Sequence, residues 1–243
     1  MASRYDRIGL DYSELRKPDP RIAAAIEAAL ADSRTVLNVG AGAGSYEPAG
    51  REVTALEPSI EMIRQRRTRA AAIVQGRAED LPFADKSFDA SMAILTVHHW
   101  SDQARGLREM RRVTRGPVVL LTYDPSFRGF WLFDYFPGLV ALDEAQMPKL
   151  ADYGPSLGPV GIAPVPIPHD CTDGFLAAYW RRPAAYLDPR VRGAMSSFWA
   201  LGDVSGALAR LEADLDSGAW ADRHGRLLAL EALDCGYRLV VTR

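Results

Sequence analysis

The feature that most constrains the fold of this chain is a regular alternation of short apolar runs with helix-like segments before residue 125. Apolar residues at helical spacing predict helices over 19–33, 59–67 and 101–115, and the last two open on a serine that can cap them. Apolar runs predict strands at 35–39, 51–58, 71–76, 87–95 and 116–124. Strands that alternate with helices in this way are typical of a parallel sheet with helices on both faces.

The second half of the chain differs in composition. Residues 123–199 hold 14 of the 22 aromatic residues, and residues 125–189 hold 10 of the 16 prolines. We predict a strand within 161–171, whose prolines disfavour an interior position, an amphipathic helix over 204–220 and a closing strand over 236–243. The sequence therefore predicts one domain with a mostly helical, aromatic-rich insertion over one edge of the sheet.

Charge and cysteine content narrow the class of protein. A formal net charge of −2 gives no general attraction to nucleic acid or to anionic lipid, so we expect neither as a partner. Cys171 and Cys235 form neither a disulfide framework nor a zinc spacing. Because the N-terminal stretch also lacks the apolar core of a signal peptide, we expect a cytoplasmic protein, either a monomer or a homodimer.

A glycine-rich turn follows the first predicted strand. Gly40, Gly42 and Gly44 stand at every second position, where a strand ends and the backbone can approach a ligand without Cβ contact. A dinucleotide fingerprint requires glycine where Ser45 stands, and a phosphate-binding P-loop requires a lysine that is missing. The turn therefore favours a bulky ligand other than a phosphate, although a tightly packed strand-to-helix turn is the plain alternative.

Acidic residues follow the next two strands. Glu57, at the carboxyl end of the second strand, could accept hydrogen bonds from both hydroxyls of a ribose, or serve as a helix N-terminal charge. Ala78, Glu79 and Asp80 lie in the loop after the third strand, where a carboxylate and backbone N–H groups could read an adenine edge. A solvated acidic loop is the alternative interpretation.

These segments together resemble a known family. "VLNVGAGAGSYE", "TALEPS", "AEDLPFADKSFDA", "HHW" and "LREMRRVTRGPVVLLTYD", all within residues 35–124, are similar to class I S-adenosylmethionine-dependent methyltransferases of the type-11 group, which includes ubiquinone/menaquinone-type and trans-aconitate-type small-molecule enzymes. The resemblance implies a Rossmann-like α/β fold with a seven-stranded sheet, an antiparallel last strand and helices on both faces. It also implies S-adenosylmethionine as cofactor and a small-molecule acceptor.

The resemblance assigns roles to individual residues. The glycine turn would accommodate the amino acid part of the cofactor, Glu57 its ribose, and Met62, Ala78 and Glu79 its adenine. The cofactor residues implied or expected are Tyr12, Arg16, Asn38, Gly40, Gly42, Gly44, Glu57, Pro58, Met62, Ala78, Glu79, Leu95 and Thr96. The chain departs from many relatives in carrying Asn38 for Asp and Arg77 for Asp or Asn.

The resemblance also divides the single domain, residues 1–243, into functional parts. The N-terminal segment, with Tyr5, Tyr12 and Arg16, is similar to a lid that closes over the cofactor, and the aromatic-rich insertion would be the acceptor lid. We expect an N-terminal lid and helix at 1–34, a cofactor-binding half at 35–124, an acceptor-site half at 125–220 and a closing strand at 221–243.

Three histidines are candidates for a catalytic base. His98 and His99 follow the fourth strand, at the edge where ligands bind in such sheets, and His169 follows a later candidate strand together with Asp170. Local packing is the alternative for His98 and His99, and a solvated loop beside prolines is the alternative for His169. The spacing of His98, His99, Asp124 and His169 matches no recognised metal site, so we expect no metal.

Two arginine clusters have both a functional and a plain interpretation. Arg181 and Arg182, beside Tyr179 and Trp180, could grip a carboxylate of the acceptor, or lie on the surface. The run of arginines at 64–69 is typical of a solvated helix end, and not of a nucleic-acid patch.

The sequence thus predicts in-line methyl transfer to a small molecule. A nucleic-acid methyltransferase is disfavoured, because the chain lacks an Asn/Asp-Pro-Pro-aromatic segment and is acidic overall. A nicotinamide oxidoreductase is also disfavoured, because this chain lacks the third glycine of the dinucleotide fingerprint. A cofactor-binding protein of the same fold that does not methylate remains the main alternative.

Overall fold

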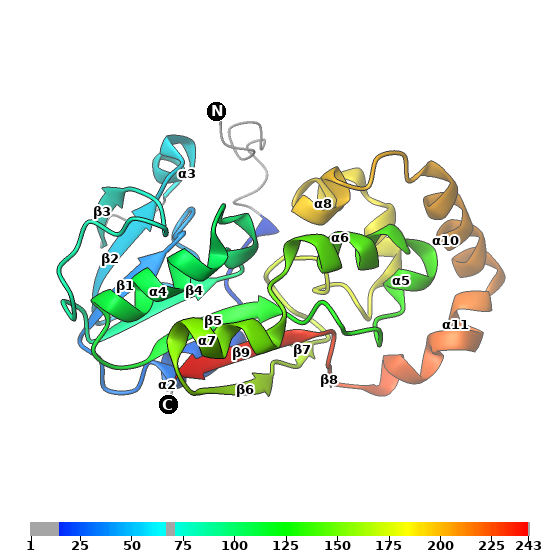
Figure 1. The fold of residues 1–243 in the computed structure, drawn as a ribbon. Coiled ribbons are helices and arrows are strands. Elements are labelled where there is room, and N and C mark those ends of the chain that lie inside the picture. The colour runs from blue at the N-terminus through cyan, green and yellow to red at the C-terminus, as the bar shows by residue number, and fades with distance from the viewer. Residues whose placement is uncertain (1–14, 67–70, 243) are drawn as a thin grey trace.

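The computed structural model describes residues 15–66 and 71–242. It contains a seven-stranded sheet with the strand order β3-β2-β1-β4-β5-β9-β6 (Figure 1). The strands are β1 (Thr35–Val39), β2 (Glu52–Glu57), β3 (Ala72–Gln75), β4 (Ala90–Ile94), β5 (Val118–Tyr123), β6 (Val160–Pro164) and β9 (Tyr237–Thr242). Two short strands, β7 (Ile167–Pro168) and β8 (Ala232–Leu233), pair separately.

The pairing directions confirm the predicted topology. Strands β1 to β5 pair in parallel, whereas β9 runs antiparallel to both of its neighbours. The segment predicted at 161–171 divides in two: β6 takes the sheet edge, where its terminal Pro164 is tolerated, and β7 leaves the sheet. The Rossmann-like α/β prediction, including the antiparallel last strand, is therefore correct.

Two apolar cores lie on opposite faces of the sheet, because successive strand residues point to opposite sides. Val36 packs with Ile22 and Ile26 of helix α2 (Pro20–Ala29), whereas its neighbour Leu37 belongs to the core of helices α4 (Gln103–Val113) and α7 (Tyr153–Leu157). The parallel strands are consequently buried on both sides.

The aromatic-rich insertion is mostly helical and lies beyond the carboxyl end of β5 (Figure 1). Besides α7, its α-helices are α5 (Leu132–Tyr135), α6 (Gly138–Gln146), α8 (Pro189–Gly193), α9 (Ser196–Trp199), α10 (Ser205–Ser217) and α11 (Ala219–His224). The short helix α3 (Ile60–Arg64) lies outside the insertion and follows β2. Single 3-10 turns are η2 (Val97–His99), η3 (Leu150–Asp152), η4 (Pro183–Leu187) and η5 (Gly225–Ala229). None of the helices in the described residues is long and apolar enough to cross a bilayer.

Helix caps follow the sequence in one case and differ in another. Ser59 caps α3 by accepting a hydrogen bond from the Met62 amide, as predicted. Helix α4 is capped instead by Asp102, which accepts from the Arg105 amide. Ser101 does not cap it, because its amide and hydroxyl both donate to Glu79.

Candidate functional site

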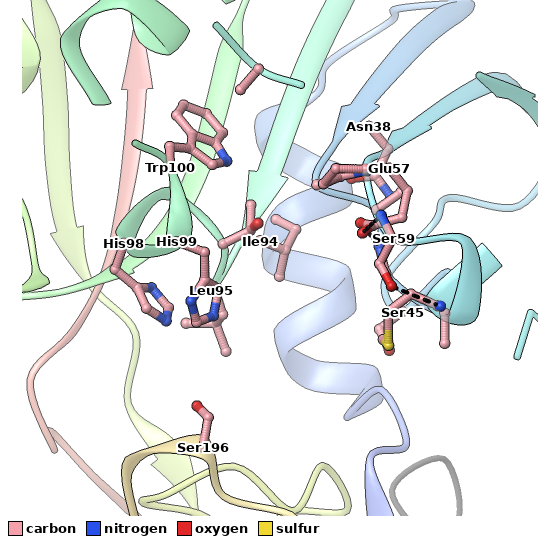
Figure 2. A pocket seen from close by; sticks show the side chains of 18 of the residues that line it. Asn38, Ser45, Glu57, Ser59, Ile94, Leu95, His98, His99, Trp100 and Ser196 are labelled. Atoms are coloured by element: carbon pink, nitrogen blue, oxygen red, sulfur yellow. Dashed lines mark hydrogen bonds between the residues drawn. The ribbon is translucent and has the colours of Figure 1, made fainter. Parts of the chain in front are cut away.

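A cavity of about 730 Å³ lies at the carboxyl ends of β1, β2, β4 and β5. This is the edge at which ligands bind in open α/β sheets, and the volume is within the roughly 300–1,000 Å³ of small-molecule sites. Figure 2 shows Asn38 and Glu57 on one side of the cavity, His98 and His99 on the other, and Ser196 of the insertion facing the space between them.

The glycine turn forms one wall through its backbone. Gly40 and Gly42 have φ angles of 69° and 53°, which other residues adopt only with strain. A Cβ on Gly40 would lie 2.2 Å from the Thr96 hydroxyl oxygen, so the turn and the end of β4 touch only because this residue is glycine. Gly44 does not line the cavity, and its missing Cβ faces the guanidinium of Arg66 at 3.2 Å.

Glu57 connects the glycine turn to the start of α3. Its two carboxylate oxygens accept the Gly42 amide at 2.8 Å and the Ser59 amide at 2.9 Å. Burial raises the pKa of Glu57, although these two N–H groups oppose the shift. A carboxylate offers about four lone-pair sites, so acceptor capacity remains toward the cavity.

A buried ion pair supports the turn from behind. Arg66 is paired with Glu47 at 2.6 Å, and the arginine side chain is only 2% exposed. Arg66 also donates to the Gly42 carbonyl, and Asn38 donates to Glu47 at 3.1 Å. The prediction of a solvated arginine run is therefore wrong for Arg66, because the Glu47 carboxylate holds it inside. The Glu47 carboxylate thus lies beside position 38, where many relatives carry Asp.

The residues expected around an adenine line a continuous part of the cavity. Pro58, Met62 and Ala78 are among its lining residues, and the latter two are buried. Glu79 also lines it, but one carboxylate oxygen accepts the Ser101 amide at 2.7 Å and the Ser101 hydroxyl at 2.8 Å. Although burial opposes it, these bonds hold the pKa of Glu79 below its ordinary value.

The turn after β4 is strained and contributes to the opposite wall. Leu95 has a φ of 52°, which is rare for a residue with a branched side chain, and its amide donates to Leu121 at 2.8 Å. His98 and His99 follow with ring centroids 3.9 Å apart. Burial and the nearby His99 hold the pKa of His98 well below its ordinary value, so this imidazole is neutral at physiological pH.

Several predicted residues lie away from the cavity. His169 is not among its lining residues, and its Nε2 lies 3.4 Å from a Glu231 carboxylate oxygen. Arg181 and Arg182 are also absent from the lining and donate instead to the backbone carbonyls of Leu230, Cys171 and Ala178. Tyr5 and Tyr12 lie outside the described residues.

Arg16 is the N-terminal residue that reaches the cavity. It lines the cavity and donates to the buried Asp173 at 2.5 Å. Asp173 also accepts the hydroxyl of Tyr46, which belongs to the glycine turn segment. Within residues 15–66 and 71–242, no cluster of three or more His, Cys, Asp or Glu residues could hold a metal ion.

Comparison with known proteins agrees with this geometry. A family model described as "Methyltransferase domain" matches residues 37–121. A solved structure from Anabaena variabilis ATCC 29413, assigned as a methyltransferase from an antibiotic biosynthesis pathway, is 37% identical and has a TM-score of 0.86. The match covers 94% of this chain and 99% of that one. The chain belongs to the S-adenosylmethionine-dependent methyltransferases.

Curated members of this methyltransferase family match only in part. A malonyl-[acyl-carrier protein] O-methyltransferase of Pseudescherichia vulneris is 34% identical over 50% of this chain and 52% of its own length. A demethylmenaquinone methyltransferase of Renibacterium salmoninarum is 36% identical over 39% of this chain and 44% of its own length. The chain therefore spans about half, or less, of the length of these curated relatives.

The cavity of this methyltransferase fits S-adenosylmethionine, the cofactor of the family. Positive φ angles at Gly40 and Gly42 expose backbone to the cavity without a Cβ, and the Glu57 carboxylate stands beside them. Met62 and Ala78 provide an apolar slot adjoining Glu57. Bare backbone, a carboxylate with acceptor capacity and an apolar slot suit an amino acid, a sugar and a base in turn.

The far end of the cavity contains residues that sequence reasoning missed. We call this end the aromatic half; its residues are Tyr123, Asp143, Phe175, Leu176, Met195 and Tyr237. Tyr123 could have been found, because it is the last residue of β5 and strand ends carry ligand-binding residues. Asp143 gave no sequence signal, because it lies within a short helix among ordinary surface-type residues.

Proposed function

We propose that the protein transfers the methyl group of S-adenosylmethionine to a small-molecule acceptor held in the aromatic half of the cavity. The observation that supports this most strongly is the continuity of one cavity from Glu57 and the glycine turn to Tyr123 and Tyr237. A cofactor and an acceptor could therefore meet inside the protein. When bound, the cofactor supplies an electrophilic methyl group for in-line displacement.

The residues of this chain supply binding and alignment. Gly40 and Gly42 admit the amino acid part of the cofactor, Glu57 accepts its ribose hydroxyls, and Met62 and Ala78 contact its adenine. Leu95 and Thr96 line the cavity beside the sulfonium of the cofactor, and the insertion excludes water from the acceptor. Holding two reactants in line can be worth an effective molarity on the order of 10⁵ M.

The identity of the acceptor cannot be taken from the names of the relatives. Their names specify a malonyl-[acyl-carrier protein] in one case and demethylmenaquinone in another, and the chain spans about half of their length or less. The division into a cofactor-binding half at 35–124 and an acceptor-site half at 125–220 is part of the proposal. The acidic net charge favours a small molecule over a nucleic acid.

Labelled methyl transfer tests the proposal directly. The protein is incubated with S-adenosylmethionine carrying a labelled methyl group and with a panel of phenols, alcohols, amines, thiols and carboxylic acids. We expect saturable binding of S-adenosylhomocysteine by calorimetry and transfer of label to at least one panel class. A protein that binds S-adenosylhomocysteine and labels nothing would be the non-methylating alternative.

A further inference from the structure

Among the aromatic-half residues, Asp143 alone carries a carboxyl group. We propose that Asp143 is the general base of the methyl transfer, and that the acceptor is an uncharged, largely aromatic molecule methylated on a hydroxyl. This inference rests on the proposed function and specifies its acceptor.

Asp143 lies on α6 and lines the cavity while being only 5% exposed. Within the part of the chain that the structure describes, its carboxylate has no hydrogen-bond partner. A buried carboxylate is normally satisfied by donors, because an unpartnered one loses its hydration without compensation. A carboxylate left open toward a cavity is therefore suited to receive a donor from a ligand.

Tyr123 lines the same part of the cavity, but its hydroxyl oxygen is buried away from it. Its hydroxyl is buried and has no hydrogen-bond partner among the described residues. The ring is fixed, since a Cβ on Gly236 would lie 2.6 Å from it and Tyr237 packs edge-on with centroids 5.4 Å apart. Burial and the nearby Asp143 raise the pKa of Tyr123, so it remains a phenol that can donate a hydrogen bond.

The Asp143 carboxylate favours a hydroxyl as the reacting group. A hydroxyl group has one proton to give to this carboxylate and keeps a lone pair for attack on the methyl carbon. An amine beside Asp143 would be held as its ammonium ion, which has no lone pair for that attack, and a carboxylate ligand would be repelled by Asp143. None of the aromatic-half residues is an arginine or lysine, and Arg16 is paired with Asp173.

The proton affinity of Asp143 suits a base that works near neutrality. Burial raises the pKa of Asp143 to about 7, although the Arg128 guanidinium opposes the shift. The titratable groups that interact with it are Tyr123 from β5 and Tyr237 from β9, both protonated because burial raises their pKa. His98, on the turn after β4, is a weaker base because burial lowers its pKa.

The proposed step balances in atoms and charge. The acceptor oxygen forms a bond to the methyl carbon as the carbon–sulfur bond breaks, and the O–H proton passes to the Asp143 carboxylate. The products are a methyl ether, S-adenosylhomocysteine and a protonated Asp143, which later returns its proton to water. No oxidant, reductant or metal is needed.

The test compares the wild-type protein with Asp143→Asn and a control, Glu212→Gln, which changes an exposed carboxylate on α10. The acceptor probes are catechol and 1-naphthol, with benzoate and 1-naphthoate as anionic counterparts. We expect transfer to the hydroxyl probes only. Asp143→Asn should lower kcat by about 100- to 10,000-fold, as for loss of a general base, with S-adenosylhomocysteine affinity unchanged.

The pH profile separates a base from a packing residue. In the wild type and in Glu212→Gln, kcat should rise with pH through about 7 as Asp143 ionises, and Asp143→Asn should lack this limb. An Asp143→Asn protein with near-wild-type kcat or an intact limb would overturn the inference. So would a wild type that binds S-adenosylhomocysteine yet methylates neither hydroxyl probe. Failure to bind S-adenosylhomocysteine would instead refute the proposed function.

Discussion

At the scale of single residues, Glu57 has a structural role, to which the proposed function adds a binding role. Its carboxylate fixes the Gly42 and Ser59 amides, which sets the position of the glycine turn relative to α3. The same carboxylate lines the cavity and is 7% exposed. A ribose placed there would complete its hydrogen bonding, so the cost of burying the charge would be partly recovered when the cofactor binds.

Glu57→Ala should therefore weaken the binding of S-adenosylhomocysteine by ~1–3 kcal/mol, because the ribose hydroxyls lose a buried acceptor. Calorimetry on the purified protein measures this change as a rise in Kd. Glu52→Ala is the matched control, since Glu52 is an exposed glutamate at the start of the same strand. Equal affinities for the two variants would contradict the assignment of Glu57 to the ribose.

The place of Gly40, Gly42 and Glu57 at the cavity was predictable because their sequence signals are local. Gly40 and Gly42 come just after β1, and Glu57 is the last residue of β2. A position at the carboxyl end of a strand fixes where a residue lies in an α/β sheet. Asp143 and Arg66 were missed for the opposite reason. Their roles come from burial by segments distant in sequence, and neither residue differs locally from a solvated one.

At the scale of elements, Asp173 joins three segments that are far apart in the chain. It accepts from Arg16 of the N-terminal segment and from Tyr46 of the glycine turn segment. Asp173 itself belongs to the insertion, and the backbone of Gly174 also bonds to Leu15. The N-terminal segment, the cofactor turn and the insertion are thus tied at one point beside the cavity.

Removal of this charge should destabilise the protein. Asp173→Asn removes the carboxylate that pairs with the largely buried Arg16, which costs about 3 kcal/mol for pairs of this kind. For a chain of this length, that loss lowers Tm by roughly 6–12 °C. Differential scanning calorimetry provides the measurement, and Asp170→Asn is the control, because Asp170 pairs with Arg21 in the open. The control should leave Tm nearly unchanged, and similar Tm values for both variants would argue against the role of Asp173.

Elements were predicted better than their contacts. Alternating apolar runs placed all five parallel strands, because each run is short, apolar and bounded by a turn. The path of 161–171 was harder, since Pro164 and Pro168 fit either an edge strand or a loop. The Asp173 ion pair spans 157 positions, and no local pattern specifies a pairing at that distance.

At the scale of the whole molecule, the two ends of the cavity differ in how their buried charged groups are paired. The cofactor end satisfies its buried charges, with Glu57 bound to amides and Glu47 paired to Arg66. The aromatic half leaves Asp143 buried without a donor among the described residues. Functional sites often retain such an unfavourable group at the expense of stability.

Because Asp143 is buried, the free energy of unfolding should depend on pH. Between the ordinary value of 3.8 and about 7, folded Asp143 holds a proton that the unfolded chain has already released. The folded state then binds more protons, so this residue makes the free energy of unfolding fall as pH rises through the window. Asp143→Asn removes the titration and should be more stable than the wild type at pH 8, with the advantage shrinking toward pH 4.

Urea unfolding at pH 4 and pH 8, at constant ionic strength, measures the difference between the two proteins. Asp19, whose pKa is lowered to about 2 by Arg21 against the effect of burial, acts with the opposite sign but is present in both proteins and cancels. Glu212→Gln should follow the wild type at both pH values. A stability difference between Asp143→Asn and the wild type that does not change with pH would show that the Asp143 carboxyl is not desolvated, and the argument for an open acid at the acceptor site would fail with it.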